Sequence, residues 1–305
     1  MRFHVLEVHK EEGNDSDPVP FSRKVHLFAK MMRNLGHTVY VHDKPYVESI
    51  DAVIQRRDFL CVLGSCYVDV TSKYPDHMAV EFGIGYIGQF SPYRVFESYA
   101  WMHMSLGAHY GWQANGEAYW TVIPNFFEPE TFPFVEVPDD YFLYLGRVTP
   151  RKGWYIAVDV AYLTGIPLIV AGALDRPLDR AVDYRGEVSE DEKLKLLSGA
   201  KAVFCPTQYI EPFNNVHIEA QLCGTPVIST DWGSYTETIT NGFNGYRCSI
   251  LRDYVRATEL VGNLDRVAIR EAAVARYSTN VIGPQYEDYF HRLETLWDKG
   301  WYAAH

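Results

Sequence analysis

The segment that decides the fold reads FCPTQYIEPFNNVHIEAQLCGTPVISTD over residues 204–231. From Asn214 onward, apolar residues recur at the spacing of one helix face, namely Val216, Ala220 and Cys223. Gly224 then predicts the end of this helix, and Pro226 prevents the helix from resuming. Residues 227–230 follow as a short buried strand. A helix that leads directly into such a strand indicates an α/β protein.

Two carboxylates, Glu211 and Glu219, lie on either side of the predicted start of this helix. Glu211 precedes Pro212, so its backbone is expected to be extended. Glu219 lies on the helix, roughly 7–8 Å along the axis from Asn214 at a rise of 1.5 Å per residue. Because a helix N-terminus attracts anions, the segment predicts a site for an elongated ligand that carries an anionic group near its middle.

The two glutamates with seven residues between them, followed by Gly-Thr-Pro-Val-Ile, closely resemble the E-x7-E signature of retaining glycosyltransferases of family four. The resemblance implies the GT-B fold, an α/β architecture of two Rossmann-like domains with parallel sheets that face a central cleft. It also implies that Glu211 holds hydroxyl groups of the donor sugar and that Glu219 accepts hydrogen bonds from the ribose. Backbone amides near the helix start would face the sugar and phosphates, at Phe213, Asn214 and Asn215.

A second segment, Gly146 to Gly153, reads GRVTPRKG and lies between a predicted strand and a predicted helix. It resembles the diphosphate clamp of the same family. Arg147 offers a planar fork of N–H donors, and Lys152 adds a compact positive charge, so both suit a leaving group that gains negative charge. Arg147, Lys152 and Glu211 are therefore the expected catalytic residues, and Gly146 is expected to contact the donor.

The resemblance further places the nucleotide base near the turn at Gly186 and Val188. Ser189 and Glu192 follow with the spacing of a capping box, which predicts the start of another helix at this point.

The first half of the chain begins as a strand, a helix and a second strand, which is a Rossmann-type opening. Residues 80–88 contain three glycines that permit close backbone approach, so they predict either an acceptor-side loop with Glu81 and Tyr86 or a surface turn. A helix is predicted over residues 92–106. His103 on this helix is a further acceptor-side candidate, with a structural role as the alternative.

A metal-binding triplet is formally present as Asp15-Ser16-Asp17. Such triplets bind a divalent metal in transferases of the GT-A fold, whereas the resemblance to family four implies a metal-free reaction. No metal and no cofactor are expected beyond the co-substrate, a UDP- or GDP-linked sugar.

The length of 305 residues suits two domains. We expect an acceptor-side domain over 1–139, a nucleotide-sugar-binding domain over 140–285, and a C-terminal helix over 286–305 that crosses back to the first domain. A hydrophobic content of 47% with 22% charged residues is typical of a soluble globular protein. The net charge of −11 makes nucleic acid an improbable partner.

Cysteine usage and hydropathy indicate where the protein acts. The five cysteines form no CxxC pair, which is typical of a reducing compartment. No stretch reaches the ~18 apolar residues of a membrane span, and the N-terminus begins with a strand-like run instead of a signal peptide. A cytoplasmic location is therefore expected.

Together these features predict a metal-independent glycosyltransferase that moves a hexose-type sugar from a nucleotide-diphosphate donor to a hydroxyl acceptor with retention of configuration. The acceptor is open among a glycan, a lipid, a small molecule and a modified base. The alternatives are a phage-type glycosyltransferase for DNA bases, which the net charge disfavours, a sugar-nucleotide epimerase, and a non-catalytic protein that binds sugar nucleotides.

Overall fold

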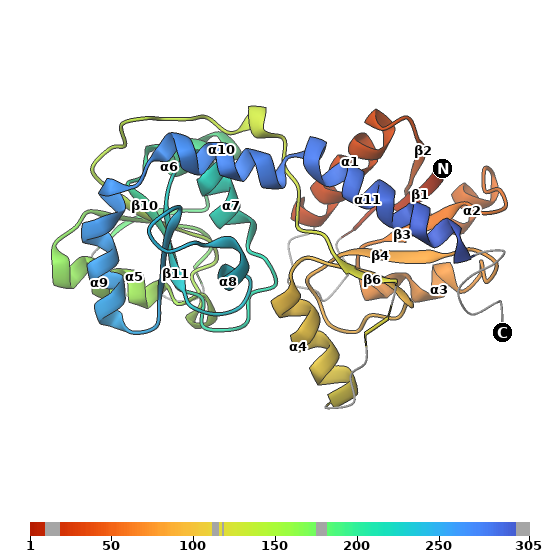
Figure 1. Cartoon of the computed structure of the whole chain (residues 1–305), viewed down its shortest axis with the longest axis horizontal. Coiled ribbons are helices and arrows are strands. Elements are labelled where there is room, and N and C mark those ends of the chain that lie inside the picture. The colour runs from red at the N-terminus through yellow and green to blue at the C-terminus, as the bar shows by residue number, and fades with distance from the viewer. Residues whose placement is uncertain (10–18, 112–115, 118, 175–181, 297–305) are drawn as a thin grey trace. The chain divides into compact units, whose positions relative to one another are not determined.

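The structure is a computed structural model that describes residues 1–9, 19–111, 116–117, 119–174 and 182–296. It divides into two compact units, drawn in Figure 1. The first comprises Met1–Ser98, Met102–Phe127 and Thr279–His305, and the second comprises Tyr99–Trp101 and Glu128–Ser278. Each unit contains a six-stranded parallel sheet, which confirms the predicted α/β class. In the described part of the chain, no helix has the length and apolar character needed to cross a membrane.

The sheet of the first unit has the strand order β2-β1-β3-β4-β5-β6. Its strands are β1 (Arg2–Leu6), β2 (Thr38–His42), β3 (Phe59–Val62), β4 (Ala79–Ile84), β5 (Tyr93–Phe96) and β6 (Trp120–Val122). Side chains of a strand alternate between its two faces, and two separate clusters follow this alternation. Phe3 and Phe59 belong to one cluster, whereas Leu6 and Leu60 belong to the other.

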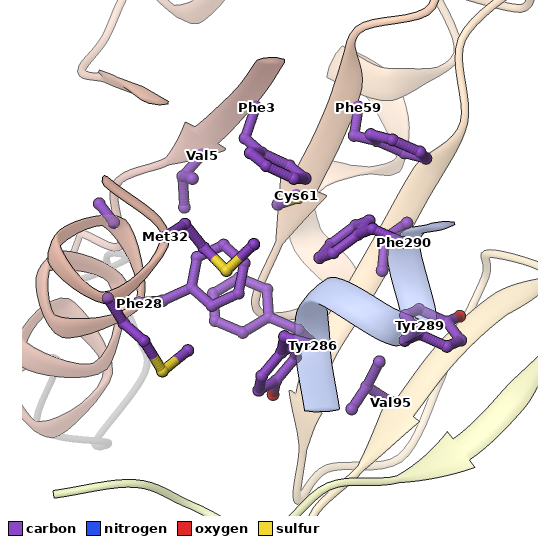
Figure 2. Packing of buried hydrophobic residues seen from close by; sticks show 14 of the residues in the cluster. Phe3, Val5, Phe28, Met32, Phe59, Cys61, Val95, Tyr286, Tyr289 and Phe290 are labelled. Atoms are coloured by element: carbon purple, nitrogen blue, oxygen red, sulfur yellow. The ribbon is translucent and has the colours of Figure 1, made fainter. Parts of the chain in front are cut away.

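Helices α1 (Val19–Asn34) and α11 (Thr279–Glu294) pack together on the first cluster. Figure 2 shows the aromatic side chains of α11 among those of the sheet and α1. The Phe290 ring lies 4.6 Å from the Phe3 ring and 4.9 Å from the Phe59 ring, both edge to face. Tyr286 meets Phe28 of α1 at 5.2 Å in the same way. The last helix is therefore an integral part of the first unit's core.

The opposite face of this sheet is covered by short helices. They are α2 (Tyr46–Asp51), the 3-10 turn Ser65–Tyr67 and α3 (Val68–Thr71). Ile50 and Tyr67 pack there against Leu60 and Val62 of β3. Helix α4 spans Tyr99–Tyr110, and its residues from Met102 onward belong to this unit.

The sheet of the second unit has the order β12-β11-β10-β7-β8-β9. Its strands are β7 (Phe142–Leu145), β8 (Leu168–Ala171), β9 (Asp183–Gly186), β10 (Ala202–Cys205), β11 (Val227–Thr230) and β12 (Gly245–Cys248). The predicted strand at 227–230 is confirmed to the residue as β11, and β10 is its neighbour in the sheet. Both are fully buried and contain β-branched residues, with turn signals on each side, the pattern that a buried parallel strand favours.

Helices cover both faces of this sheet. One face carries α5 (Trp154–Thr164) and α9 (Leu251–Leu260), which contribute Val158, Val160 and Tyr254 to a shared core with the strands. Three further helices pack with one another, α6 (Glu190–Gly199) beside α7 (Asn215–Leu222) and α7 beside α10 (Arg266–Tyr277). The second unit also contains α8 (Tyr235–Thr238) and 3-10 turns at Pro129–Thr131, Pro150–Lys152 and Val261–Asn263.

Two local predictions for the first unit are wrong. Residues 92–106 do not form one helix, because Tyr93–Phe96 is strand β5 and the helix begins only at Tyr99. Val95 fits the helical spacing by coincidence, while its neighbours Arg94 and Phe96 pair with β6. Residues 80–88 are likewise not a loop throughout, since Ala79–Ile84 is the buried strand β4.

The connection between the units differs from the predicted boundary near residue 139. Phe126 packs in the first core, and the carbonyl of Phe127 accepts a hydrogen bond from the N–H of Thr279. The following segment is held by arginines of α10. Arg270 donates to the Phe132 carbonyl at 2.8 Å, and Arg266 donates to the Val135 carbonyl at 2.8 Å. These bonds tie residues 128–139 to the second unit.

Candidate active site

The predicted catalytic residues Arg147, Lys152 and Glu211 lie at the carboxyl ends of the strands of the second sheet. Gly146 and Arg147 directly follow β7, and the loop with Glu211 follows the neighbouring strand β10. Parallel strands deliver their carboxyl ends to one edge of a sheet, where open α/β proteins place their ligands. The topology therefore brings two segments together that lie some sixty residues apart in the sequence.

Lys152 and Glu211 form a direct ion pair at this edge. The Lys152 Nζ atom lies 2.6 Å from Glu211 Oε2, and the two side chains are only 19% and 7% exposed. Burial disfavours the charged ammonium, but the carboxylate of Glu211 and the nearby Tyr209 outweigh it and raise the pKa of Lys152 above its ordinary value. Lys152 is therefore a stable cation next to a carboxylate that is almost enclosed.

The Tyr209 ring supports both basic side chains of the β7–α5 turn. The Arg151 guanidinium lies 4.6 Å from the centre of this ring, and Lys152 Nζ lies 5.3 Å from it. Cations are attracted to the face of an aromatic ring at such distances. Tyr209 is not among the residues predicted from the sequence, although it lies only two positions before Glu211.

The backbone of Glu211 is fixed by the segment that follows β11. The Ser234 N–H donates to the Glu211 carbonyl at 3.2 Å, and Ser234 Oγ donates to the Phe213 carbonyl at 2.9 Å. Gly233 passes so close that an added Cβ would lie 2.9 Å from the Glu211 nitrogen. The serine at 234 thus has a defined positioning role.

Asn214 adopts the conformation that a glycine would be expected to take. Its φ of 65° is left-handed, a region that asparagine tolerates better than most residues. The side chain adds a hydrogen bond, because Nδ2 donates to Tyr235 Oη at 2.6 Å. Tyr235 is fully buried and also contacts Thr207 Oγ1 at 3.1 Å. Asn214 therefore combines a glycine-like turn with an anchor to the protein interior.

Helix α7 begins at Asn215 and carries Glu219. Glu219 Oε1 accepts a hydrogen bond from Lys193 of α6 at 3.2 Å, and Lys193 also contacts Glu190 at 3.0 Å. The other oxygen, Glu219 Oε2, is buried and has no hydrogen-bond partner among the described residues. An unpaired buried carboxylate oxygen is costly, so it is poised to accept a hydrogen bond from a ligand. Lys193 is not among the residues predicted from the sequence, because only the packing of α6 beside α7 brings it to Glu219.

Four other predicted donor contacts, Gly146, Arg147, Gly186 and Val188, lie in the same unit. Arg147 is exposed, and its carbonyl accepts a hydrogen bond from Tyr144 Oη at 2.8 Å. Gly186 ends β9, and Val188 is half-buried in the turn before α6. Ser189 caps α6, since its hydroxyl accepts from the Glu192 N–H at 3.3 Å. Contacts of Gly146, Arg147, Gly186 and Val188 with a donor stay predictions.

The acceptor-side candidates belong to the first unit. Glu81 is fully buried on β4, and its carboxylate accepts hydrogen bonds from Tyr86 Oη at 3.0 Å and from the N–H groups of Phe90 and Ser91 at 3.0 and 2.8 Å. Glu81 therefore clamps the loop after its own strand. His103 is exposed on α4. A contact of Glu81, Tyr86 or His103 with an acceptor stays a prediction.

The triplet Asp15-Ser16-Asp17 lies outside the described residues. Within the described ranges, no group of three or more His, Cys, Asp or Glu side chains is placed to hold a metal ion.

Comparison with known proteins shows what the second unit is similar to. Residues 130–253 match the family model described as glycosyl transferases group 1. The matched residues lie in the second unit. Over 149 residues the chain is 30% identical to a glycogen synthase of Mycobacterium tuberculosis, a match that covers 42% of this chain and 36% of that protein. A phosphatidyl-myo-inositol mannosyltransferase of Mycobacterium leprae is 25% identical over 178 residues, covering 52% of this chain and 48% of that protein.

The sequence alignments with these two curated relatives span less than half of each relative's length. Solved structures, in contrast, superpose on nearly the whole chain. AviGT4, described as a glycosyltransferase involved in avilamycin A biosynthesis, superposes with a TM-score of 0.77 at 21% identity over 96% of this chain and 97% of its own. Anabaena HepE, solved with UDP and glucose, superposes with a TM-score of 0.68 at 14% identity over 95% and 99% of the two chains. These similarities identify the fold as GT-B.

Proposed function

We propose that this protein is a glycosyltransferase that moves a hexose-type sugar from a UDP- or GDP-linked donor to a hydroxyl acceptor, with retention of configuration and without a metal ion. The observation that carries the proposal is the buried pair of Lys152 and Glu211 beside the helix that presents Glu219. The match of residues 130–253 to the glycosyl transferases group 1 model supports it.

In this proposal Glu211 holds hydroxyl groups of the donor sugar, with its carboxylate oriented by Lys152. Glu219 accepts hydrogen bonds from the ribose, and its unpartnered buried Oε2 supports that assignment. The amides near Phe213, Asn214 and Asn215 face the sugar and phosphates.

Bond cleavage between the sugar and the diphosphate places additional negative charge on the leaving group. Arg147 and Lys152 lie in the turn after β7 and supply positive charge there, which is the electrostatic role that a metal ion has in other transferases. The raised pKa of Lys152 keeps this charge present at neutral pH. Gly146, Gly186 and Val188 would complete the donor contacts with the phosphates and the base.

The donor requirement is tested by thermal denaturation of the full chain with UDP- and GDP-linked hexoses. A donor present at 100 times its dissociation constant stabilises a protein by about 2.7 kcal/mol, which is a clear shift in Tm. Release of nucleoside diphosphate is then followed with mixed acceptors, and the anomeric configuration of the product is determined by NMR. A chelator in one arm tests metal independence.

Lys152→Met and Glu211→Gln are expected to abolish transfer at a temperature where both variants remain folded. Lys201→Met is the matched control, because Lys201 pairs with Asp140 next to the amino end of β10, at the opposite edge of the same sheet. Transfer that continues unchanged in both site variants would refute the proposal. Donor binding without turnover against every acceptor class would identify a binding protein instead.

A further inference from the structure

A separate cavity of about 270 Å³ opens at the carboxyl edge of the second sheet. It lies where β11 and β12 end, between the first turns of α5 and α9. The residues that matter for its chemistry are Tyr155, Asp159, Gln208, Thr230, Trp232 and Tyr254. The cavity lies near the proposed donor site, because Lys152 precedes α5 by two residues and Gln208 precedes Glu211 by three. None of the lining residues, however, is a proposed donor contact.

Two of the residues that line the cavity, Thr230 and Tyr254, have buried hydroxyl groups. Thr230 is 2% exposed and Tyr254 is 3% exposed, and neither hydroxyl has a hydrogen-bond partner among the described residues. Buried hydroxyls are normally hydrogen-bonded, so two orphans that line one cavity point to a polar ligand. Burial raises the pKa of the Tyr254 hydroxyl above its ordinary value, so this group keeps its proton and can donate.

The rim of the cavity is aromatic and accessible. Tyr155 and Trp232 are 38% and 39% exposed, although both side chains are large and apolar. Trp232 is held in place because its Nε1 donates to the Thr207 carbonyl at 3.2 Å. A fixed aromatic surface above buried hydroxyl groups suits a ligand with both an apolar face and polar edges.

The charges of the lining residues argue against an anionic ligand. Asp159 contributes a carboxylate, and the described lining residues include no lysine, arginine or histidine. A phosphate or carboxylate ligand would meet no cation here. The volume lies just below the range of roughly 300–1,000 Å³ that is usual for drug-sized ligands, which favours a single ring.

We propose that this cavity binds one neutral sugar ring, stacked on Trp232 and hydrogen-bonded to Thr230 and Tyr254. The site is distinct from the donor site and takes part in no step of the transfer reaction. A neutral pyranose has the required chemistry, because its C–H face packs on an aromatic ring and its hydroxyl groups satisfy both buried hydroxyls.

The test measures binding of D-glucose, D-mannose and maltotriose to the full chain by saturation-transfer NMR titration. Trp232→Ala is expected to weaken binding at least tenfold, while Trp232→Phe retains the stacking surface and most of the affinity. Thr230→Val and Tyr254→Phe each remove one hydroxyl and are expected to weaken binding about threefold to tenfold. Neither hydroxyl has a partner to lose, so these two variants are expected to fold.

Two control variants separate this site from other surfaces. Phe243→Ala removes another exposed aromatic residue that does not line the cavity and is expected to leave the affinity unchanged. Glu211→Gln disables the proposed donor-sugar contact and, measured at a temperature where this variant remains folded, is also expected to leave the affinity unchanged. The proposal is overturned if no probe binds at tens of millimolar, if Trp232→Ala binds as the unchanged protein does, or if Glu211→Gln abolishes binding. Preference for maltotriose over glucose would identify a glycan as the source of the ring, and equal affinity would identify the free sugar.

Discussion

Lys152 Nζ lies 2.6 Å from Glu211 Oε2, and this contact joins the turn after β7 to the loop after β10. The two strands are neighbours in the sheet, so the pair links the two segments that carry most of the candidate donor site. Both side chains are largely buried. If one of them is removed, water cannot easily solvate the charge that remains. The pair is therefore important both for stability and for the geometry of the site.

Removing one member of this pair is expected to destabilise the protein strongly. Glu211→Gln leaves the Lys152 charge without its partner, and breaking a buried pair costs about 3–5 kcal/mol. Lys201→Met breaks the exposed contact with Asp140 and is expected to cost less than about 1 kcal/mol. Urea denaturation of both variants gives the comparison, and the double variant Glu211→Gln with Lys152→Met should recover part of the loss. Equal costs for the two single variants would contradict the prediction.

A second prediction concerns the unpartnered oxygen of Glu219. If it accepts hydrogen bonds from a ribose, the protein should bind UDP or GDP more tightly than the matching 2′-deoxynucleotide, by about tenfold for a hydrogen bond to a charged group. Glu219→Gln replaces the carboxylate by an amide and should reduce this ratio to a few-fold. Isothermal titration of both nucleotides against the unchanged protein and the variant measures this affinity ratio. A ratio that does not change on substitution would exclude Glu219 from the ribose contact.

The sequence predicted the second unit better than the first for a physical reason. Strand β10 is an apolar run, β11 is fully buried and rich in β-branched residues, and α7 is bounded by Asn214 and Gly224, so local signals coincide with the fold. In residues 92–106 the local signals conflict, because Val95 and Leu106 share a helical spacing while Val95 itself pairs with β6. Sheet pairing over a long sequence distance decided that conflict.

In the candidate site, too, residues in local sequence motifs were predicted, whereas residues that depend on long-range contacts were not. Glu211, Glu219 and Lys152 were identified because they lie in short recognisable segments. Lys193 and Tyr235 were not, since their contacts with Glu219 and Asn214 span more than twenty residues and depend on how helices pack. The spacing of residues along the chain does not show which helices pack together.

The pH dependence of stability is expected to follow a buried histidine chain in the first unit. His4 Nδ1 lies 2.9 Å from His42 Nε2, His4 Nε2 lies 2.8 Å from Asp58, and His42 Nδ1 lies 2.7 Å from Ser49 Oγ. Burial, together with the neighbouring His4, lowers the pKa of His42 to about 4. The unfolded chain, with a histidine pKa near 6.5, therefore binds the proton first as the pH falls.

Stability is thus fully present above about pH 6.5 and is expected to fall between about pH 6.5 and pH 4, by at most about 1.4 kcal/mol per pH unit for this group. Urea midpoints at pH 7 and pH 5 measure the slope. His42→Gln removes one titrating group and should reduce the slope, although not to zero, because burial also lowers the pKa values of His4, His37 and His217. His109→Gln, on the exposed end of α4, should leave the slope unchanged. An identical slope in all three proteins would assign the acid sensitivity to other groups.

The two glycines that flank α5 have the same backbone conformation but different surroundings. Substituting each of them therefore separates the cost of a steric clash from the cost of the left-handed conformation. Gly153 and Gly165 have nearly equal positive φ values of 70° and 72°. A Cβ at Gly153 would lie 1.9 Å from the Pro206 carbonyl oxygen, whereas a Cβ at Gly165 would meet nothing within 4 Å. Gly165→Ala is therefore expected to cost about 1–2 kcal/mol, the usual penalty of a left-handed conformation.

Gly153→Ala carries the same penalty and must also move the turn away from the end of β10, because backbone atoms cannot yield as a side chain does. That displacement would shift the neighbouring Lys152 away from Glu211, so the variant should lose donor binding as well as more stability than Gly165→Ala. Thermal denaturation and nucleotide titration of the two variants test both parts. If Gly153→Ala binds UDP or GDP as tightly as Gly165→Ala does, the close contact with Pro206 does not position Lys152.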